Sequence, residues 1–136
     1  KAVMSNAGKV FFAIAAAVTA AAIALTIKRI MSSQLSAIPS DAIRHKDELT
    51  LADIVMYFKN LDLDKTVDTP FVSKNLDKYK VKLPEIPQSG EHVLLVGVYE
   101  EKSDILKDYI IVYSQHYDEA LQEVLAKAVD DVVALS

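Results

Sequence analysis

An uninterrupted stretch without a charged residue, at residues 10–27, constrains this chain more than any other feature. It is 18 residues long, and Lys9 precedes it while Lys28 and Arg29 follow it. As a helix it would measure about 27 Å, because each helical residue adds about 1.5 Å. That length is close to the thickness of the hydrocarbon core of a bilayer, about 30 Å. The sequence therefore predicts a single membrane-spanning helix.

The composition of this run gives insertion only a small margin. Eight of its residues are strongly apolar, eight are alanine and two are threonine. At about −0.3 to −0.6 kcal/mol for each strongly apolar residue, insertion gains about 2.5 to 5 kcal/mol. A cleaved signal peptide is the alternative, since Ala-x-Ala patterns occur inside the run. The run is, however, longer than the usual apolar region of such peptides, about 7–15 residues, so we favour an anchor.

Alanines give one side of this helix a smooth surface. Their spacing of three and four places six of them together: Ala13, Ala16, Ala17, Ala20, Ala21 and Ala24. In lipid, helices associate through close packing of small residues rather than through the hydrophobic effect. We predict that another helix docks on this face. A face that meets only lipid is the competing interpretation, because small residues are common in membrane spans.

The helix is expected to continue beyond the run. Apolar residues recur at steps of three and four as far as Ile38, with serines on the other side, and Pro39 ends the pattern. The predicted helix at residues 10–38 is thus apolar all round in its first half and one-sided in its second. The second half should lie against a folded domain.

Length and charge set the remaining organisation. We expect a tail at residues 1–9, the helix at 10–38, a linker at 39–49 and a small domain at 50–136. The chain carries a net charge of −4, and its first four charged residues are all cations, so that residues 30–136 carry −8. An acidic domain on a basic-flanked anchor argues against a nucleic-acid partner and for an aqueous domain held away from anionic lipid. The partners expected for the anchor are membrane lipid and the helices of other membrane proteins or of copies of this chain. Because the first residue is Lys1 rather than methionine, we expect an upstream segment to have been removed.

The domain should be α+β. Thr50 and Asp53 form a capping-box pattern before an apolar-faced helix, and Thr69-Pro70 predicts the start of a second one. Residues 92–99 and 105–113 predict a β-hairpin, with one further strand expected near Lys80. A long helix at residues 115–134, capped by Ser114, should cover the hairpin with Leu121 and Val124.

No pattern for chemistry emerges from the sequence. The acidic residues 62–68 fail as a calcium loop, because Val67 and Ser73 occupy the positions that require glycine and a bidentate acid. The three histidines lack metal-site spacing, and three glycines cannot build a phosphate-binding loop. The chain has no cysteine, so thiolate chemistry is excluded. We therefore expect no enzyme activity, no catalytic or metal site and no cofactor.

These observations predict a non-catalytic, single-pass membrane protein that serves as an accessory or assembly subunit of a larger complex. The alternative is a filament subunit whose hydrophobic helix is buried among copies of itself. In its two-part helix the chain resembles type IV pilins, and that resemblance implies such a buried helix. The likeness is architectural only, because the glutamate of those proteins is absent from residues 1–7.

Overall fold

The computed structural model describes residues 21–35, 37–64, 66–76 and 83–135. Over these residues the chain is an α+β fold, as predicted, with a mixed five-stranded sheet and three α-helices. The helices are α2 (Ala21–Gln34), α3 (Leu51–Lys59) and α4 (Glu119–Leu125), and a 3₁₀ turn lies at Ser40–Ala42. The strands are β1 (Ile43–Leu49), β2 (Asp68–Ser73), β3 (His92–Glu100), β4 (Ile105–Tyr117) and β5 (Val132–Ala134).

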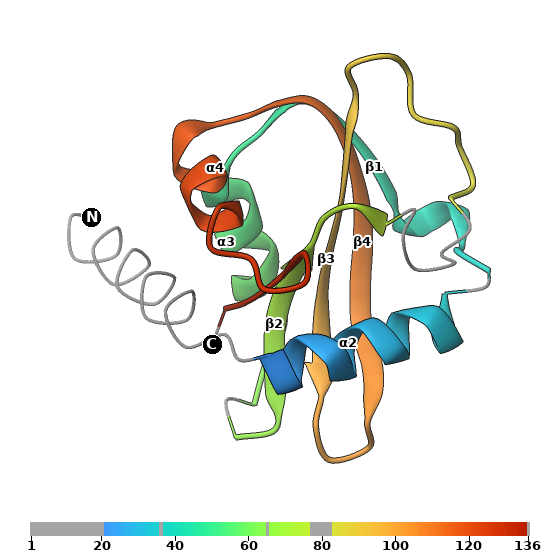
Figure 1. The fold of residues 1–136 in the computed structure, drawn as a ribbon, viewed down its shortest axis with the longest axis vertical. Coiled ribbons are helices and arrows are strands. Elements are labelled where there is room, and N and C mark those ends of the chain that lie inside the picture. The colour runs from blue at the N-terminus through green and yellow to red at the C-terminus, as the bar shows by residue number, and fades with distance from the viewer. Residues whose placement is uncertain (1–20, 36, 65, 77–82, 136) are drawn as a thin grey trace.

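The sheet is built around the predicted hairpin, which is confirmed as β3 and β4. The strand order is β1-β4-β3-β2-β5, with β1 parallel to β4 and every other neighbouring pair antiparallel. At 13 residues β4 is the longest strand, and its far end pairs with β1. Figure 1 shows α3 and α4 on one side of the sheet and α2 crossing the other.

Residues of alternating orientation in the strands divide the core into two layers. From β3, Leu94, Val96 and Val98 face α3 and α4, whereas Leu95 and Tyr99 face α2. This is the pleat of a strand with both faces covered, and it explains the nearly continuous apolar run of β3. The middle of the sheet is therefore internal, and the helices on both faces cover it.

Helix α2 belongs to this core. Four of its residues and the residue directly after it lie in this layer and are almost completely buried: Ala24, Ile27, Ile30, Met31 and Leu35. Their steps of three and four are those of a one-sided helix, so the predicted contact between the second half of the helix and a domain is confirmed here. The helix ends at Gln34 rather than at Ile38, and residues 10–20 of the predicted helix lie outside the described residues.

A polar contact ties α2 to the turn of the hairpin. The Arg29 guanidinium lies 3.1 Å from an Asp104 carboxylate oxygen, and the Tyr99 hydroxyl donates to the other oxygen at 2.8 Å. Asp104 has a positive φ of 57°, a conformation that Asp and Asn tolerate better than most residues. Burial, together with the neighbouring Asp104 carboxylate, raises the pKa of Tyr99 to about 12, so its hydroxyl remains a donor at neutral pH.

Protonation of Asp104 should weaken this tie. Hydrogen bonds from Tyr99 and Arg29 hold the pKa of Asp104 below its ordinary value of 3.8. The carboxylate therefore stabilises the fold above that pH, and its contribution is lost as the pH falls through the lowered, folded-state pKa. We expect Asp104→Asn to lower the melting temperature at pH 7, and the gap between variant and parent to close below pH 3.8. Thermal unfolding followed by circular dichroism checks this; a gap independent of pH would contradict it.

Three stretches differ from the sequence-based prediction. The expected linker contains β1, an edge strand whose side chains are almost all exposed, so no apolar pattern marked it. The stretch from Thr69-Pro70, predicted to start a helix, is strand β2, because its residues pair with β3 on one side and β5 on the other. The strand expected near Lys80 lies outside the described residues.

The C-terminal helix was predicted much too long. Residues 114–117 continue β4, because β1 pairs with them beyond the point where the pairing with β3 ends. The helix starts after Asp118 and ends at Leu125, and Asp130 and Asp131 then turn the chain with positive φ values. Strand β5 follows and pairs with β2. Leu121 and Val124 are nevertheless buried against the sheet, as predicted.

One carboxylate caps two helices. Asp118 Oδ1 accepts the backbone N–H of Leu121 at 3.0 Å and that of Leu51 at 3.1 Å. These N–H groups belong to the first turns of α4 and α3, where helical partners are missing. The predicted capping box of Thr50 and Asp53 is also present in α3. The two helices are thus joined at their N-termini by a residue that neither contains.

Asp118→Ala should therefore cost more than the loss of an ordinary cap. Two N–H groups lose their acceptor at once, and we expect the free energy of unfolding to fall by about 1–3 kcal/mol. Asp118→Asn keeps an acceptor oxygen and serves as the matched control. Urea unfolding of both variants measures the difference; equal losses would show that the shared cap does not stabilise the fold.

Candidate functional site

Four of the six alanines predicted to form a docking face lie outside the described residues: Ala13, Ala16, Ala17 and Ala20. Ala21 begins α2, and Ala24 is fully buried in the layer between α2 and the sheet. Ala24 therefore meets the chain's own domain. For the other alanines, contact with a partner helix stays a prediction.

The burial of α2 also changes the expected membrane span. Ala24 and Ile27 belong to residues 10–27, yet both are buried under the sheet. They cannot face lipid and the sheet at once, so only residues 10–23, before the first buried position, could be surrounded by lipid on all sides. As a helix those residues would measure about 21 Å, against about 30 Å of hydrocarbon. Across the described ranges, no helix combines the length and apolarity that crossing a bilayer requires.

The acidic turn before β2 is used within the fold. Asp64 accepts hydrogen bonds from the backbone N–H and the hydroxyl of Thr66, at 3.0 and 2.6 Å. The buried Asp68 side chain accepts from the Asp64 N–H and from the Lys107 ammonium, each at 2.9 Å. The hydrogen bond with Asp68 raises the pKa of Lys107. The two carboxylates thus accept hydrogen bonds within the turn and from a neighbouring lysine.

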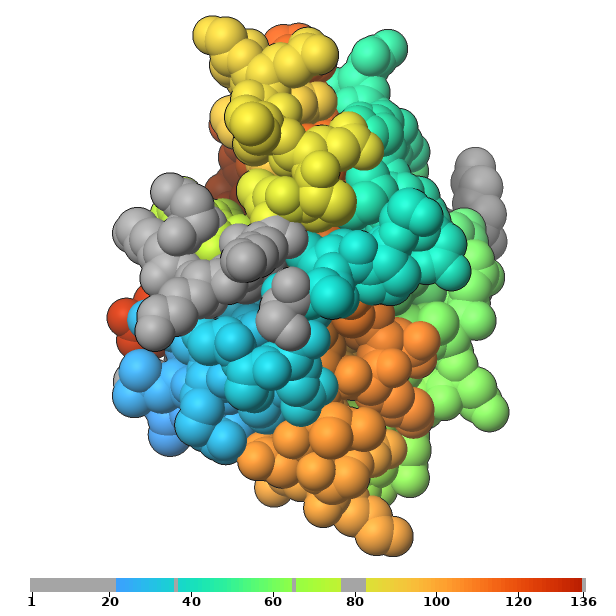
Figure 2. Space-filling view, turned by 90° about the vertical axis from the view of Figure 1, so that its right-hand side faces the viewer, coloured from blue at the N-terminus to red at the C-terminus, as the bar shows by residue number. Residues whose placement is uncertain are grey.

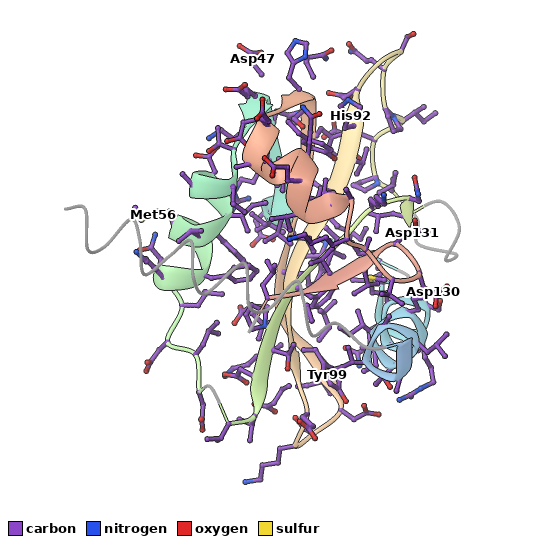
Figure 3. The ribbon with its side chains drawn as sticks, turned by 60° about the vertical axis from the view of Figure 1, so that its left-hand side comes forward. Asp47, Met56, His92, Tyr99, Asp130 and Asp131 are labelled. Carbon is purple, nitrogen blue, oxygen red and sulfur yellow. The ribbon has the colours of Figure 1, made fainter. Side chains whose placement is uncertain are left out.

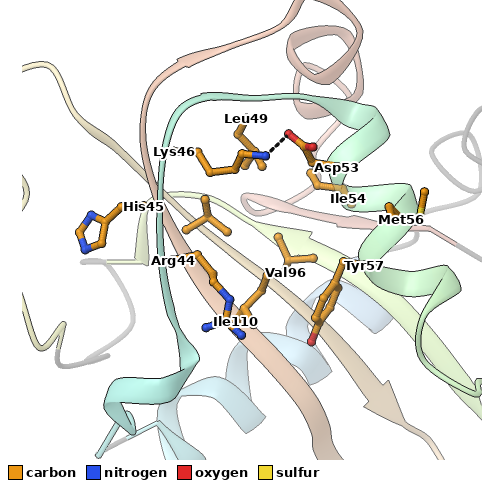
Figure 4. A pocket seen from close by; sticks show the side chains of 11 residues that line it. Arg44, His45, Lys46, Leu49, Asp53, Ile54, Met56, Tyr57, Val96 and Ile110 are labelled. Carbon is orange, nitrogen blue, oxygen red and sulfur yellow. Dashed lines mark ion pairs between the residues drawn. The ribbon is translucent and has the colours of Figure 1, made fainter.

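A groove lies between the edge strand β1 and helix α3. Its volume is about 250 Å³. Three apolar residues from the middle of the sheet form its floor: Val96, Ile110 and Val112 (Figure 4). Arg44 and Lys46 of β1 form one wall, and Met56 and Tyr57 of α3 form the other. We call this the β1–α3 groove.

The two cations of the groove differ in what they contact. Lys46 pairs with Asp53 at 2.9 Å (Figure 4). Burial alone would raise the pKa of Asp53, but hydrogen bonds from Lys46 and Thr50 outweigh it and keep the pKa low. Arg44 donates to the backbone carbonyls of Asp41 and Ile43 and, within the described part of the chain, forms no ion pair with a carboxylate. Its charge is available to a ligand or partner.

Tyr57 gives the groove a hydrogen-bond donor. Burial, helped by the charge of Asp108, raises the pKa of this phenol to about 12, although Arg44 opposes the shift. The hydroxyl is therefore protonated at neutral pH. In Figure 4 the Tyr57 hydroxyl and the Arg44 guanidinium lie toward the same end of the groove. An apolar group that carries a carboxylate would match this arrangement.

The histidine next to the groove is turned away from it. His45, the histidine beside it, points away (Figure 4) and stacks on Tyr113 of the α2 side, with ring centroids 5.2 Å apart. Its imidazole also lies 3.2 Å from the Glu85 carboxylate. The ring thus has partners on the far side of the sheet from Tyr57.

Sequence reasoning missed this groove because it treated residues 39–49 as a linker. Once β1 is recognised as a strand, the spacing of Arg44 and Lys46 places both on one face. Met56, 58 % exposed, stands at the rim of the groove, on the side of the sheet opposite α2 (Figure 3). Comparison with protein-family models, curated protein sequences and solved structures finds no match to this chain.

Proposed function

We propose that this protein is a non-catalytic assembly subunit that joins an acidic domain to a larger membrane complex through its apolar N-terminal segment. The observation that carries the proposal is the burial of Ala24 and Ile27 against the sheet. Because α2 is part of the core, whatever holds the residues before it also holds the domain. The domain cannot swing free on a linker at that point.

The length of the uncharged segment before Ala24 suggests what could cover it. Fourteen uncharged residues, 10–23, precede the first buried position of α2. Stretches of about 10–14 apolar residues more often lie within protein or at an interface than across a bilayer. Helices of a membrane complex would cover this segment, and its alanines allow their close approach.

A filament is the second candidate. The same observation favours it, since copies of the segment can cover one another while the acidic domains, attached through α2, form the outer surface. The two candidates predict particles of different composition, one containing foreign chains and the other a regular polymer of this chain.

Enlarging the alanine face tests the proposal. We expect Ala17→Leu to abolish assembly by obstructing close approach, and to leave the melting temperature of the domain unchanged because residue 17 precedes α2. Phe11→Leu is the control and should assemble normally. The particle mass is measured after extraction of the full chain in mild detergent. A monomer for the parent chain, or normal assembly of Ala17→Leu, would contradict an assembly role for this face.

A further inference from the structure

The segment between β2 and β3 displays one apolar side chain almost entirely to solvent. Ile86 is 92 % exposed and lies between Pro84 and Pro87. The two prolines restrict the backbone on either side of it. We call residues 84–87 the Ile86 knob. Its apolar surface is thus accessible to a partner, and covering it would be favourable.

The knob is anchored to the sheet from below. The Tyr113 hydroxyl donates to the Glu85 backbone carbonyl at 2.7 Å, and His45 lies 3.2 Å from the Glu85 carboxylate. Figure 2 shows this segment beside β1 on the face that carries α2. Because its position is fixed before binding, the knob would lose little conformational entropy when it docks.

The β1–α3 groove has the matching features. Its apolar floor and the exposed Met56 suit an aliphatic side chain. Arg44, which has no carboxylate partner among the described residues, suits the Glu85 carboxylate that precedes Ile86. An isoleucine side chain also fits within about 250 Å³. Shape, apolarity and charge thus agree between the two surfaces.

The two surfaces cannot meet within one molecule. The knob rests on Tyr113, which belongs to the layer under α2, whereas the groove opens on the α3 side of the sheet. We infer that the Ile86 knob of one copy docks in the β1–α3 groove of a second copy, with Glu85 paired to Arg44. Such a contact joins two different surfaces, so it repeats from copy to copy and builds a ring or a row. This contact between copies does not involve residues 10–23. It is therefore a second interaction, separate from the proposed assembly through the N-terminal segment.

Cysteine cross-linking of the full chain tests this contact, because the sequence contains no cysteine of its own. One preparation carries Ile86→Cys and the other Met56→Cys, and a short bismaleimide is added. We expect a cross-linked dimer when the two are mixed, and little when either is treated alone. In the control, Leu25→Cys replaces Met56→Cys, since Leu25 is similarly exposed, at 55 %, on α2. Equal cross-linking of Ile86→Cys to both partners would overturn the inference.

A charge exchange makes the test specific. Arg44→Glu in the groove copy should reduce the mixed cross-link at least about tenfold, since like charges at an interface repel. Glu85→Arg in the knob copy should restore it. Glu85→Arg removes the contact with His45, but the hydrogen bond from Tyr113 is kept because it uses the backbone carbonyl of residue 85. No loss with Arg44→Glu, or loss without restoration, overturns the Glu85–Arg44 pairing.

Two further measurements keep the outcome clear. Melting temperatures close to that of the parent show that each variant is folded, as expected for exposed positions. Repeating the mixture with Ala17→Leu in both copies separates this contact from the proposed N-terminal assembly. The knob–groove cross-link should persist in that background even if the large particle is lost; its disappearance there would show that the copies meet only through residues 10–23.

Discussion

Replacing Ile27 with alanine should lower the free energy of unfolding of the full chain by about 2–5 kcal/mol. Ile27 is 1 % exposed and lies in the layer that α2 shares with the sheet. The substitution removes apolar contacts and leaves a cavity that the rigid sheet on one side cannot fill. For a fold of this size that is a large part of the total stability, about 5–15 kcal/mol.

Leu25→Ala is the matched control for this prediction. It lies on the same helix, two residues away, and is 55 % exposed. Its truncation should change stability by no more than about 0.5 kcal/mol. Denaturant unfolding in mild detergent measures both. If residues 10–27 crossed a bilayer as a unit apart from the domain, Ile27→Ala and Leu25→Ala would have the same small effect, and that result would contradict the burial of α2.

Leu121→Ala should be equally costly, at about 2–5 kcal/mol. Leu121 is fully buried where α4 packs on the sheet, in the layer that also holds Val96 and Val112. It is the residue whose N–H binds Asp118, so α4 is fixed at this point by packing and by capping together. The surroundings are therefore unable to collapse into the space that is left.

Glu123→Ala is the control for α4, because this exposed residue lies on the same short helix and faces solvent. Its effect should stay within about 0.5 kcal/mol. The midpoint of urea unfolding gives both values. An unchanged midpoint for Leu121→Ala would show that α4 does not seal the sheet.

Local signals in the sequence were sufficient for part of the fold. The hairpin was predictable, because β-branched and aromatic runs flank a charged turn. The start of α3 was predictable from Thr50 and Asp53, since a capping box needs only residues three apart. The one-sided pattern after Lys28 also indicated correctly that the helix packs on a domain.

The remainder depends on partners distant in the sequence. Strand β1 is polar and exposed, and it becomes a strand because β4, more than sixty residues later, offers it an edge. The same pairing extends β4 to Tyr117. The N-cap of the following helix is therefore Asp118 and not Ser114, the cap that the sequence predicted. The β1–α3 groove, the candidate site, arises from this edge pairing, so no local pattern could reveal it. The Ile86 knob, by contrast, is visible in the sequence as an isoleucine between two prolines.

The packing of α2 has a consequence for how the chain is made. Its apolar face is covered by residues of β2, β3, β4 and finally β5, including Val132, four residues from the end of the sequence. At a synthesis rate of about 5–20 residues per second, α2 therefore waits about 5–20 seconds after it is made before its cover is complete. During that interval the apolar face of α2 is uncovered next to the uncharged residues that precede it in the sequence. A chaperone or a membrane surface that engages the nascent chain would be competing directly with the protein's own last strand.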